Sequence, residues 1–164
     1  MKELHLIRHA KSESSAEYAQ DIERPLCDKG RRDAQLIASR LVDSGIRIDL
    51  LCTSPAVRAR TTAAVMTDVL AQSYEIRVEE VLYSEGEAAI HEFIKTVDDR
   101  ITSLAIVSHN PDMTRLANLL GDKRIESMPT CSVISIEFDT VSWSKIEIGS
   151  GRNTRFEYPK KPNR

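Results

Sequence analysis

The sequence predicts a three-layer α/β/α fold, in which helices cover both faces of a mostly parallel central sheet. Short apolar segments alternate along the chain with longer segments whose apolar residues recur at helical spacing. The short segments are continuously apolar, which is typical of parallel strands buried on both faces. With 164 residues and 41% hydrophobic content, the chain is large enough for one domain with its own core.

The first strand and helix lie within the first 45 residues. Residues 4–8 form a short apolar run, which predicts a strand. Asp28 is placed to cap the helix that follows, and Gly45 to end it. The apolar residues that predict this helix by their spacing are Ala34, Ile37, Ala38, Leu41 and Val42.

A second strand and helix follow directly. Residues 48–52 form another buried apolar run. Ser54 and Pro55 favour the start of a helix, because a hydroxyl can cap it and proline is tolerated in its first turn. We expect this helix to extend to Leu70. Residues 75–81 alternate between polar and apolar, which indicates a further strand.

The middle of the chain repeats the same alternation. Residues 89–97 have apolar residues at the spacing of an amphipathic helix. Residues 104–107 predict a third buried strand, and residues 110–112 open a short helix that Gly121 ends.

Two late strands and a tail complete the predicted chain. Residues 132–138 and 143–148 alternate like strands. We expect a single domain over residues 1–150. Residues 151–164 are basic and contain two prolines, which indicates a solvated C-terminal tail.

Composition narrows the class of protein. The net charge of −2 indicates neither a nucleic-acid partner nor a membrane partner. Cys27, Cys52 and Cys131 are widely spaced, which suits neither a disulfide framework nor a zinc site, so we expect a reduced, cytoplasmic setting. We see no signal peptide and no apolar run of the roughly 20 residues that a membrane span needs. Nothing in the sequence indicates an oligomeric state.

Four basic side chains follow the carboxyl ends of three predicted strands. Arg8 and His9 end the first strand, Arg58 follows the second near a helix N-terminus, and His109 follows the third. Ligands of open α/β sheets bind outside the carboxyl ends of the strands, so we expect these four side chains to form one site.

This set of residues suits phosphoryl transfer. Two guanidinium groups can bind a phosphoryl group in fork geometry and stay charged. A neutral imidazole can be a nucleophile, and a second histidine can donate to phosphoryl oxygens or handle a proton. Because we find no P-loop and no acidic cluster suited to magnesium, we infer transfer without a metal or other cofactor, through a phosphohistidine on His9. We expect His5, within a strand, and His91, within a helix, to be structural.

The motifs "LIRHAKS", "SPAVRARTTA" and "IVSHNP" together resemble the histidine phosphatase superfamily, which has the phosphoglycerate-mutase-like fold. The resemblance covers roughly residues 2–150. The short chain and the segment "RPLCDKGRRDA" are most similar to SixA-type phosphohistidine phosphatases. The site residues that this resemblance implies are the nucleophile His9, then Arg8, Arg58 and His109 around the phosphate, and Arg24 and Asn110 at the rim.

The sequence departs from the larger family members at two positions. Cys27 stands where they have a hydroxyl residue, and Ser84 stands where they have a general-acid glutamate. Glu79, Glu80 and Glu85 are nearby candidates for that acid. Without an acid, phosphohistidine is the favoured substrate, because its imidazole leaving group is protonated near neutrality. We therefore expect a phosphohistidine-containing protein as the partner.

Three alternatives remain open. The first is a small-molecule phosphomonoesterase of the same superfamily, and the second is a module that binds phosphate without turnover. The third is a cysteine-dependent phosphatase, because Cys52 and Arg58 have C-x5-R spacing. Against it, the loop between them has no glycine, Pro55 has no N–H to donate, and Cys52 continues an apolar strand.

Overall fold

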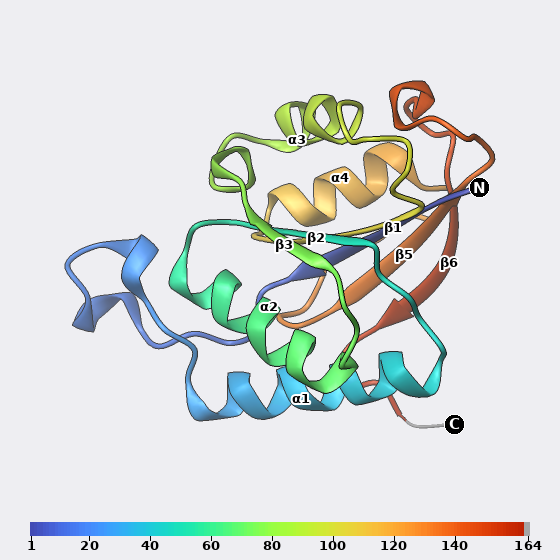
Figure 1. Cartoon of the computed structure of the whole chain (residues 1–164). Coiled ribbons are helices and arrows are strands. Elements are labelled where there is room, and N and C mark those ends of the chain that lie inside the picture. Colours follow the sequence, from blue (N-terminus) through green and yellow to red (C-terminus); the bar gives the residue numbers. More distant parts are fainter. Residues whose placement is uncertain (163–164) are drawn as a thin grey trace.

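The computed structural model describes residues 1–162 and contains a six-stranded sheet between two layers of helices (Figure 1). The strands are β1 (Lys2–Arg8), β2 (Leu50–Thr53), β3 (Glu75–Val78), β4 (Ser103–Ser108), β5 (Val133–Phe138) and β6 (Arg152–Glu157). The α-helices are α1 (Asp28–Asp43), α2 (Val57–Leu70), α3 (Glu87–Ile94) and α4 (Asp112–Leu120). Four short 3-10 helices are η1 (Ser15–Glu17), η2 (Asp21–Glu23), η3 (Glu80–Leu82) and η4 (Trp143–Lys145).

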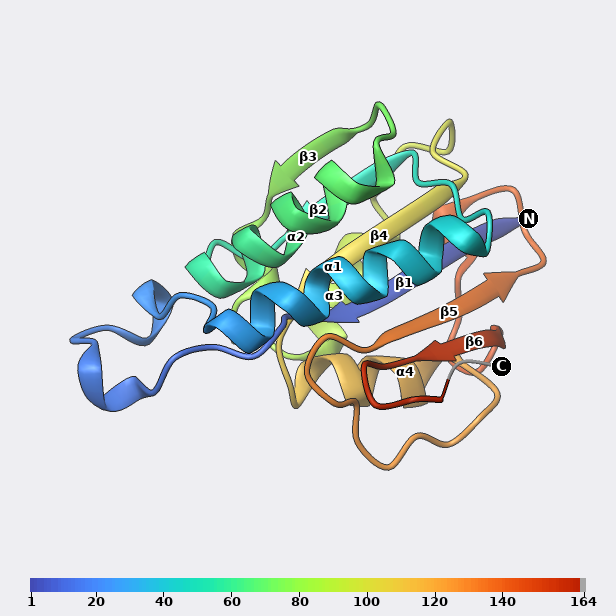
Figure 2. The same ribbon diagram turned by 90° about the horizontal axis from the view of Figure 1, so that it is seen from below.

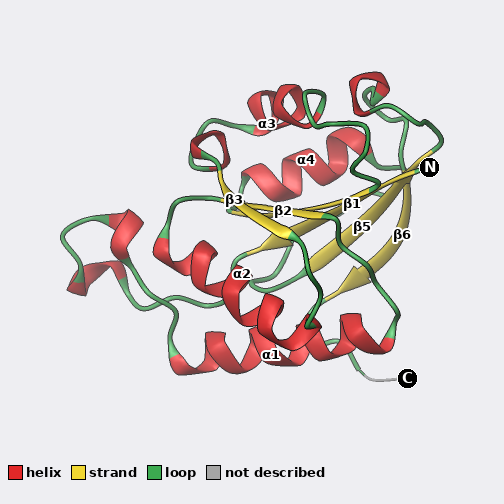
Figure 3. Cartoon of the chain, viewed as in Figure 1, coloured by secondary structure: helices red, strands yellow, loops and turns green. Residues whose placement is uncertain are grey.

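The topology confirms the predicted fold class. The strand order is β3-β2-β4-β1-β5-β6, and the first four strands of this order are mutually parallel. Strand β5 is antiparallel to β1 and to β6. Helices α1 and α2 cover one face of the sheet, and α3 and α4 cover the other (Figures 2 and 3). The sheet is therefore mostly parallel and has helices on both faces.

The continuous apolar runs arise because neighbouring strand residues pack into different helix layers. In β2, Leu50 and Cys52 belong to the core cluster that also contains the buried residues of α3 and α4. Leu51, between them, belongs to the cluster with α1 and α2. Since side chains of a strand alternate between faces, a strand covered on both sides needs apolar residues at every position.

The two residues predicted to cap helices, Asp28 and Ser54, are not the caps in the structure. Asp28 is the first residue of α1, and the cap is Cys27, whose sulfur accepts a hydrogen bond from the N–H of Gly30 at 3.4 Å. A thiol is a weaker acceptor than a hydroxyl but can fill the same place. Helix α2 begins after Ala56, so Ser54 does not cap it.

The expected strand over 143–148 and the expected tail are wrong. Trp143 begins the 3-10 helix η4, where its indole N–H donates to the carbonyl of Ile101 at 2.7 Å, so its side chain anchors a loop. The last strand is β6, within the segment expected to be a solvated tail. As an edge strand it is held by its backbone pairing with β5, so its sequence needs little apolar alternation. Residues 163–164 of the expected tail lie outside the described residues.

Gly30 lies where α1 meets the loop that follows the first strand. A β-carbon at this position would overlap the backbone carbonyl of Lys11, which also accepts from the N–H of Cys27 at 3.0 Å. We expect Gly30→Ala to lower the free energy of unfolding by about 1 to 3 kcal/mol, because backbone must move to make room. Unfolding in urea measures this free energy. Gln35→Ala, at an exposed position of the same helix, should change it by less than about 0.5 kcal/mol, and equal effects would contradict the explanation.

Candidate active site

His9 follows the last residue of β1 and is 7% exposed. Its backbone joins two neighbouring segments, since its N–H donates to Ser108 and its carbonyl accepts from Cys131, both at 3.0 Å. The ring Nδ1 donates to the carbonyl of Ala10 at 2.7 Å. This bond leaves the lone pair of Nε2 directed outward, towards Arg58, whose Nε lies 3.3 Å away. The imidazole therefore presents a fixed, unprotonated nitrogen.

Burial also keeps this imidazole neutral. Desolvation lowers the pKa of His9 to about 4, and the nearby guanidinium groups of Arg58, Arg8 and Arg24 add to the effect, although the hydrogen bond to Ala10 opposes it. At neutral pH the group therefore has the protonation state that a nucleophile needs.

We expect kcat/KM, which reports the free enzyme, to depend on pH as this shift dictates. Protonation of His9 removes the nucleophilic lone pair, so kcat/KM, corrected for the ionisation of the substrate, should fall only as pH drops through about 4. An unperturbed imidazole would give the same loss near pH 6.5. The measurement is kcat/KM for p-nitrophenyl phosphate over about pH 4 to 8, with circular dichroism to verify folding at each point. A half-maximal kcat/KM near pH 6.5 would contradict it.

Arg58 is held at both ends of its guanidinium group. It lies in the first turn of α2 and is 5% exposed. Its Nε donates to His9, while its two terminal nitrogens donate to Asp21, one to the backbone carbonyl at 2.8 Å and one to Oδ2 at 2.9 Å. The Nε side of the guanidinium therefore faces the His9 nucleophile, while Asp21 holds the terminal nitrogens in place.

Asp21 joins several side chains at the mouth of the site. Its carboxylate accepts from Arg58, from Arg24 at 2.9 Å and from the Tyr83 hydroxyl at 2.7 Å. Burial favours the protonated acid, but the hydrogen bonds from Tyr83, Arg58 and Arg24 more than offset it and hold the pKa of Asp21 well below its usual range. Asp21 therefore stays ionised and cannot act as a general acid near neutral pH.

His109 faces His9 across the site, with ring centroids 5.0 Å apart. Its Nε2 lies 2.7 Å from the hydroxyl of Ser54, and that hydroxyl also accepts from the N–H of Ala56. Within residues 1–162, its buried Nδ1 has no hydrogen-bond partner. Desolvation, with the charges of His9 and Arg58, lowers the pKa of His109 to about 3. When Ser54 donates to Nε2, Nδ1 carries the proton and can donate to a phosphoryl oxygen.

Arg8 and Asn110 share one backbone acceptor. A terminal nitrogen of Arg8 donates to the carbonyl of Met128 at 2.9 Å, and the amide of Asn110 donates to the same carbonyl at 3.0 Å. The amide oxygen of Asn110 accepts from Thr114. These bonds link Asn110 to the loop before β5, and they use only one of the two N–H donors of its amide.

Of the four residues predicted from strand ends, the structure places Arg58 and His109 against the His9 ring. The guanidinium of Arg8 is near enough for its charge to lower the pKa of His9. Arg24 is connected through Asp21. Sequence reasoning missed Asp21, Tyr83 and Ser54. Asp21 could have been found from its i,i+3 spacing to Arg24, whereas Tyr83 has no local signal.

The candidate acids and the other histidines lie outside this network. Among the described residues, no side-chain hydrogen bond or ion pair joins Glu79, Glu80 or Glu85 to the site. The ring nitrogens of His5 lie 2.8 Å and 3.0 Å from two serine hydroxyls of the sheet. His91 bonds to the carbonyl of Ile146 at 2.8 Å.

The structure argues against Cys52 as a nucleophile. Its side chain is fully buried in the core, and desolvation raises the pKa of the thiol to about 12. A reactive thiolate needs an exposed, electropositive setting. The guanidinium of Arg58 faces His9 instead.

The described residues contain no group of three or more His, Cys, Asp or Glu side chains placed to hold a metal ion. No helix within residues 1–162 is long and apolar enough to cross a membrane.

Comparison with known proteins identifies the family of this chain. Residues 4–83 match the family model for the histidine phosphatase superfamily, branch 1. A protein of Mycobacterium tuberculosis is 31% identical over 163 residues, which cover 94% of this chain and 100% of the relative. A protein of Picosynechococcus is 41% identical over 64 residues, which are 39% of each chain. The chain belongs to the histidine phosphatase superfamily.

Within that superfamily the fold is SixA-like. The structure of the protein histidine phosphatase SixA complexed with tungstate superposes with a TM-score of 0.83 at 21% identity, over 96% of this chain and 97% of the other. This likeness confirms the phosphoglycerate-mutase-like fold that the motifs imply.

Proposed function

We propose that this protein is a metal-independent phosphatase that hydrolyses protein-borne phosphohistidine through a phosphohistidine intermediate on His9. Membership in the superfamily supports a phosphatase reaction. The observation that carries the proposal is the geometry of His9, whose Nδ1 is bonded to Ala10 while Nε2 meets the guanidinium of Arg58. A fixed nucleophile next to a fixed cation is what in-line phosphoryl transfer requires.

In the first step, the lone pair of His9 Nε2 forms a bond to phosphorus. The P–N bond to the substrate imidazole breaks, and its electron pair returns to that imidazole, which is protonated by water. Arg8 and Arg58 stabilise the charge on the phosphoryl oxygens, since guanidinium groups stay protonated at working pH. His109 donates from Nδ1 to one of these oxygens.

In the second step, water attacks phosphorus and the bond to His9 Nε2 breaks. Inorganic phosphate leaves, and His9 regains the lone pair in its neutral form. The proton lost by water passes to the phosphate or to solvent. No metal ion or other cofactor takes part in either step as proposed.

The protonation states at the site support a P–N substrate. An alkyl phosphate must expel an alkoxide, which needs a proton from a general acid. The carboxylate bonded to the site, Asp21, is held ionised by its three donors, so it has no proton to give near neutral pH. An imidazole leaving group takes its proton from water and does not need that acid.

The test compares a phosphohistidine peptide, sugar phosphates and p-nitrophenyl phosphate under one set of conditions, together with acid and alkali quenching of labelled enzyme. We expect the phosphohistidine peptide to have much the highest kcat/KM, and the enzyme label to be acid-labile and alkali-stable. Preference for a sugar phosphate would favour a small-molecule phosphomonoesterase. Binding without turnover of any substrate would favour a phosphate-binding module.

A further inference from the structure

A cavity of about 370 Å³ lies on the α1 side of the molecule, between the first turns of α1, the loop before β5 and the segment after β6. Its apolar wall comes from Pro129, Tyr158 and Pro159. Its polar lining comes from three lysines, one carboxylate and one hydroxyl: Lys11, Lys29, Lys160, Asp33 and Thr130. The volume lies within the range of small-ligand pockets, which is enough for a few side chains of a bound peptide.

The rim of this cavity is positively charged. Lys29 is paired with Asp33, its Nζ 2.6 Å from a carboxylate oxygen. Among residues 1–162, neither Lys11 nor Lys160 makes a side-chain hydrogen bond or an ion pair, and both are exposed. Two uncompensated ammonium groups therefore surround an apolar wall, a combination that suits an acidic peptide segment carrying an apolar side chain.

The cavity is built from segments that adjoin the catalytic residues. Lys11 follows His9 by two residues. Pro129 follows Met128, whose carbonyl accepts a hydrogen bond from Arg8. In the same loop, the N–H of Cys131 donates to the carbonyl of His9. A segment bound here would lie close to a phosphoryl group that is bound at His9.

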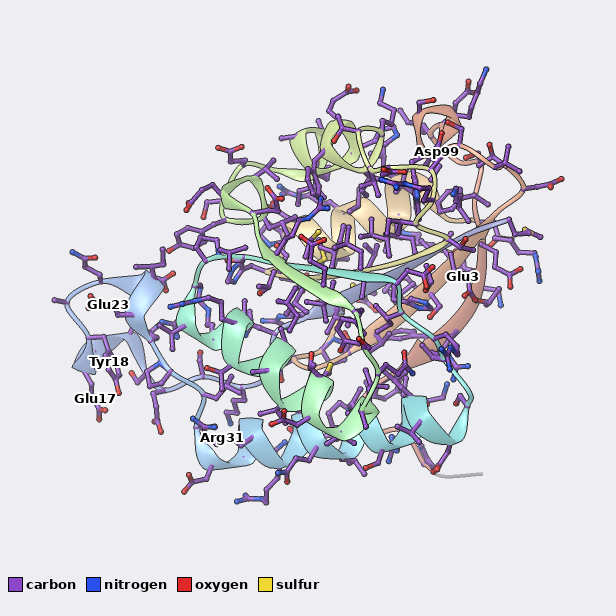
Figure 4. The ribbon with its side chains drawn as sticks, viewed as in Figure 1. Glu3, Glu17, Tyr18, Glu23, Arg31 and Asp99 are labelled. Carbon is purple, nitrogen blue, oxygen red and sulfur yellow. The ribbon has the colours of Figure 1, made fainter. Side chains whose placement is uncertain are left out.

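A segment of opposite charge lies at the mouth of the site. Residues 12–26, here called the acidic arm, project from the body of the molecule and are closed at their base by a bridge between Ser12 and Leu26 (Figures 1 and 2). Figure 4 shows Glu17, Tyr18 and Glu23 on this arm, away from Arg31 at the start of α1. The acidic side chains of the arm are Glu13, Glu17, Asp21 and Glu23.

We propose that the lysine-rimmed cavity is the docking site for an acidic segment of the phosphorylated protein substrate. This inference rests on the proposed phosphohistidine phosphatase activity and names the surface of its partner. The acidic arm repels such a segment and the lysines attract it, so the two orient the incoming protein as it presents its phosphohistidine to His9.

The test uses three probes. Two are phosphohistidine peptides of equal length, one with acidic residues around the phosphohistidine and one with amide residues in the same places. The third is phosphoramidate, which has no peptide. For the wild-type protein we expect kcat/KM to be on the order of 10-fold higher for the acidic peptide than for the neutral one, and this preference should decrease with salt.

Lys29→Glu combined with Lys160→Glu should abolish the preference and leave turnover of phosphoramidate unchanged. Because Lys29→Glu also breaks the ion pair with Asp33, Lys160→Glu alone is the second variant, and it should reduce the preference by itself. The control is Arg100→Glu combined with Lys145→Glu. It changes the net charge equally near the amino end of β4, and it should keep the preference.

The outcomes separate the two proposals. Turnover of all three probes without an acidic preference, or a preference that survives both lysine variants, overturns the docking site and leaves the proposed function intact. No turnover of any probe overturns the proposed function, and the docking inference with it.

Discussion

Replacing His9 with alanine is expected to lower the rate of phosphate release by roughly 10⁴-fold or more, the effect typical of losing a covalent nucleophile. The variant lacks the only protein atom that bonds to phosphorus in the proposed mechanism, so no phosphoenzyme can form. Steady-state release of phosphate from a phosphohistidine peptide measures the rate, and acid-quenched labelling measures the intermediate. The fold should survive, because the backbone bonds of residue 9 to Ser108 and Cys131 do not involve the imidazole.

The matched control is Cys52→Ala. It removes the other potential nucleophile while leaving the His9 imidazole in place. We expect it to lose some stability, because a fully buried side chain is shortened, but to keep its label and its turnover. A labelled His9→Ala protein, or an unlabelled Cys52→Ala protein that is still folded, would overturn the assignment of the nucleophile.

Arg58→Lys is expected to reduce kcat/KM by roughly 10²- to 10³-fold, although it keeps the positive charge. The guanidinium donates to His9 and to two oxygen atoms of Asp21 from three separate nitrogens, and the single nitrogen of an ammonium group cannot occupy all three positions. The variant therefore loses both the donor that faces the phosphoryl group and the contact that holds it. Steady-state kinetics with a phosphohistidine peptide measure the loss in kcat/KM.

Two further variants decide whether the geometry or the charge of Arg58 matters. Asp21→Asn keeps the guanidinium but weakens its clamp, and we expect kcat to fall on the order of 10-fold. Arg60→Lys makes the same conservative change two residues along the same helix, at an exposed position, and should behave as wild type. If Arg58→Lys were as active as Arg60→Lys, the proposed role of the fork would be wrong.

The central strands could be predicted from the sequence because they are buried on both faces of the sheet. The buried strands were apparent as apolar runs, since every position in them meets a helix layer. Strand β6 was missed because it lies at an edge, where backbone pairing with β5 can hold a segment as polar as Arg152–Glu157. The segment around Trp143 was assigned to a strand because alternation over a few residues does not distinguish a strand from an irregular loop with a buried anchor.

The candidate site was predictable to the extent that topology fixes it. Arg8, His9, Arg58 and His109 follow strands whose carboxyl ends meet at one edge, so their convergence needed no knowledge of side-chain contacts. Asp21 and Tyr83 belong to irregular segments far apart in the sequence, and they meet only through a hydrogen bond across the site. Contacts of this kind depend on loop conformation, for which the sequence has no periodic signal.

The backbone of His9 is bonded on one side to the end of β4 and on the other to the loop before β5. Its amide therefore cannot open to solvent unless the central strands separate. We expect its hydrogen–deuterium exchange to be as slow as that of the innermost strand amides, and far slower than that of the acidic arm. On heating, protection of this amide should then be lost together with the cooperative unfolding of the sheet, so that its exchange reports directly on the fraction of folded molecules.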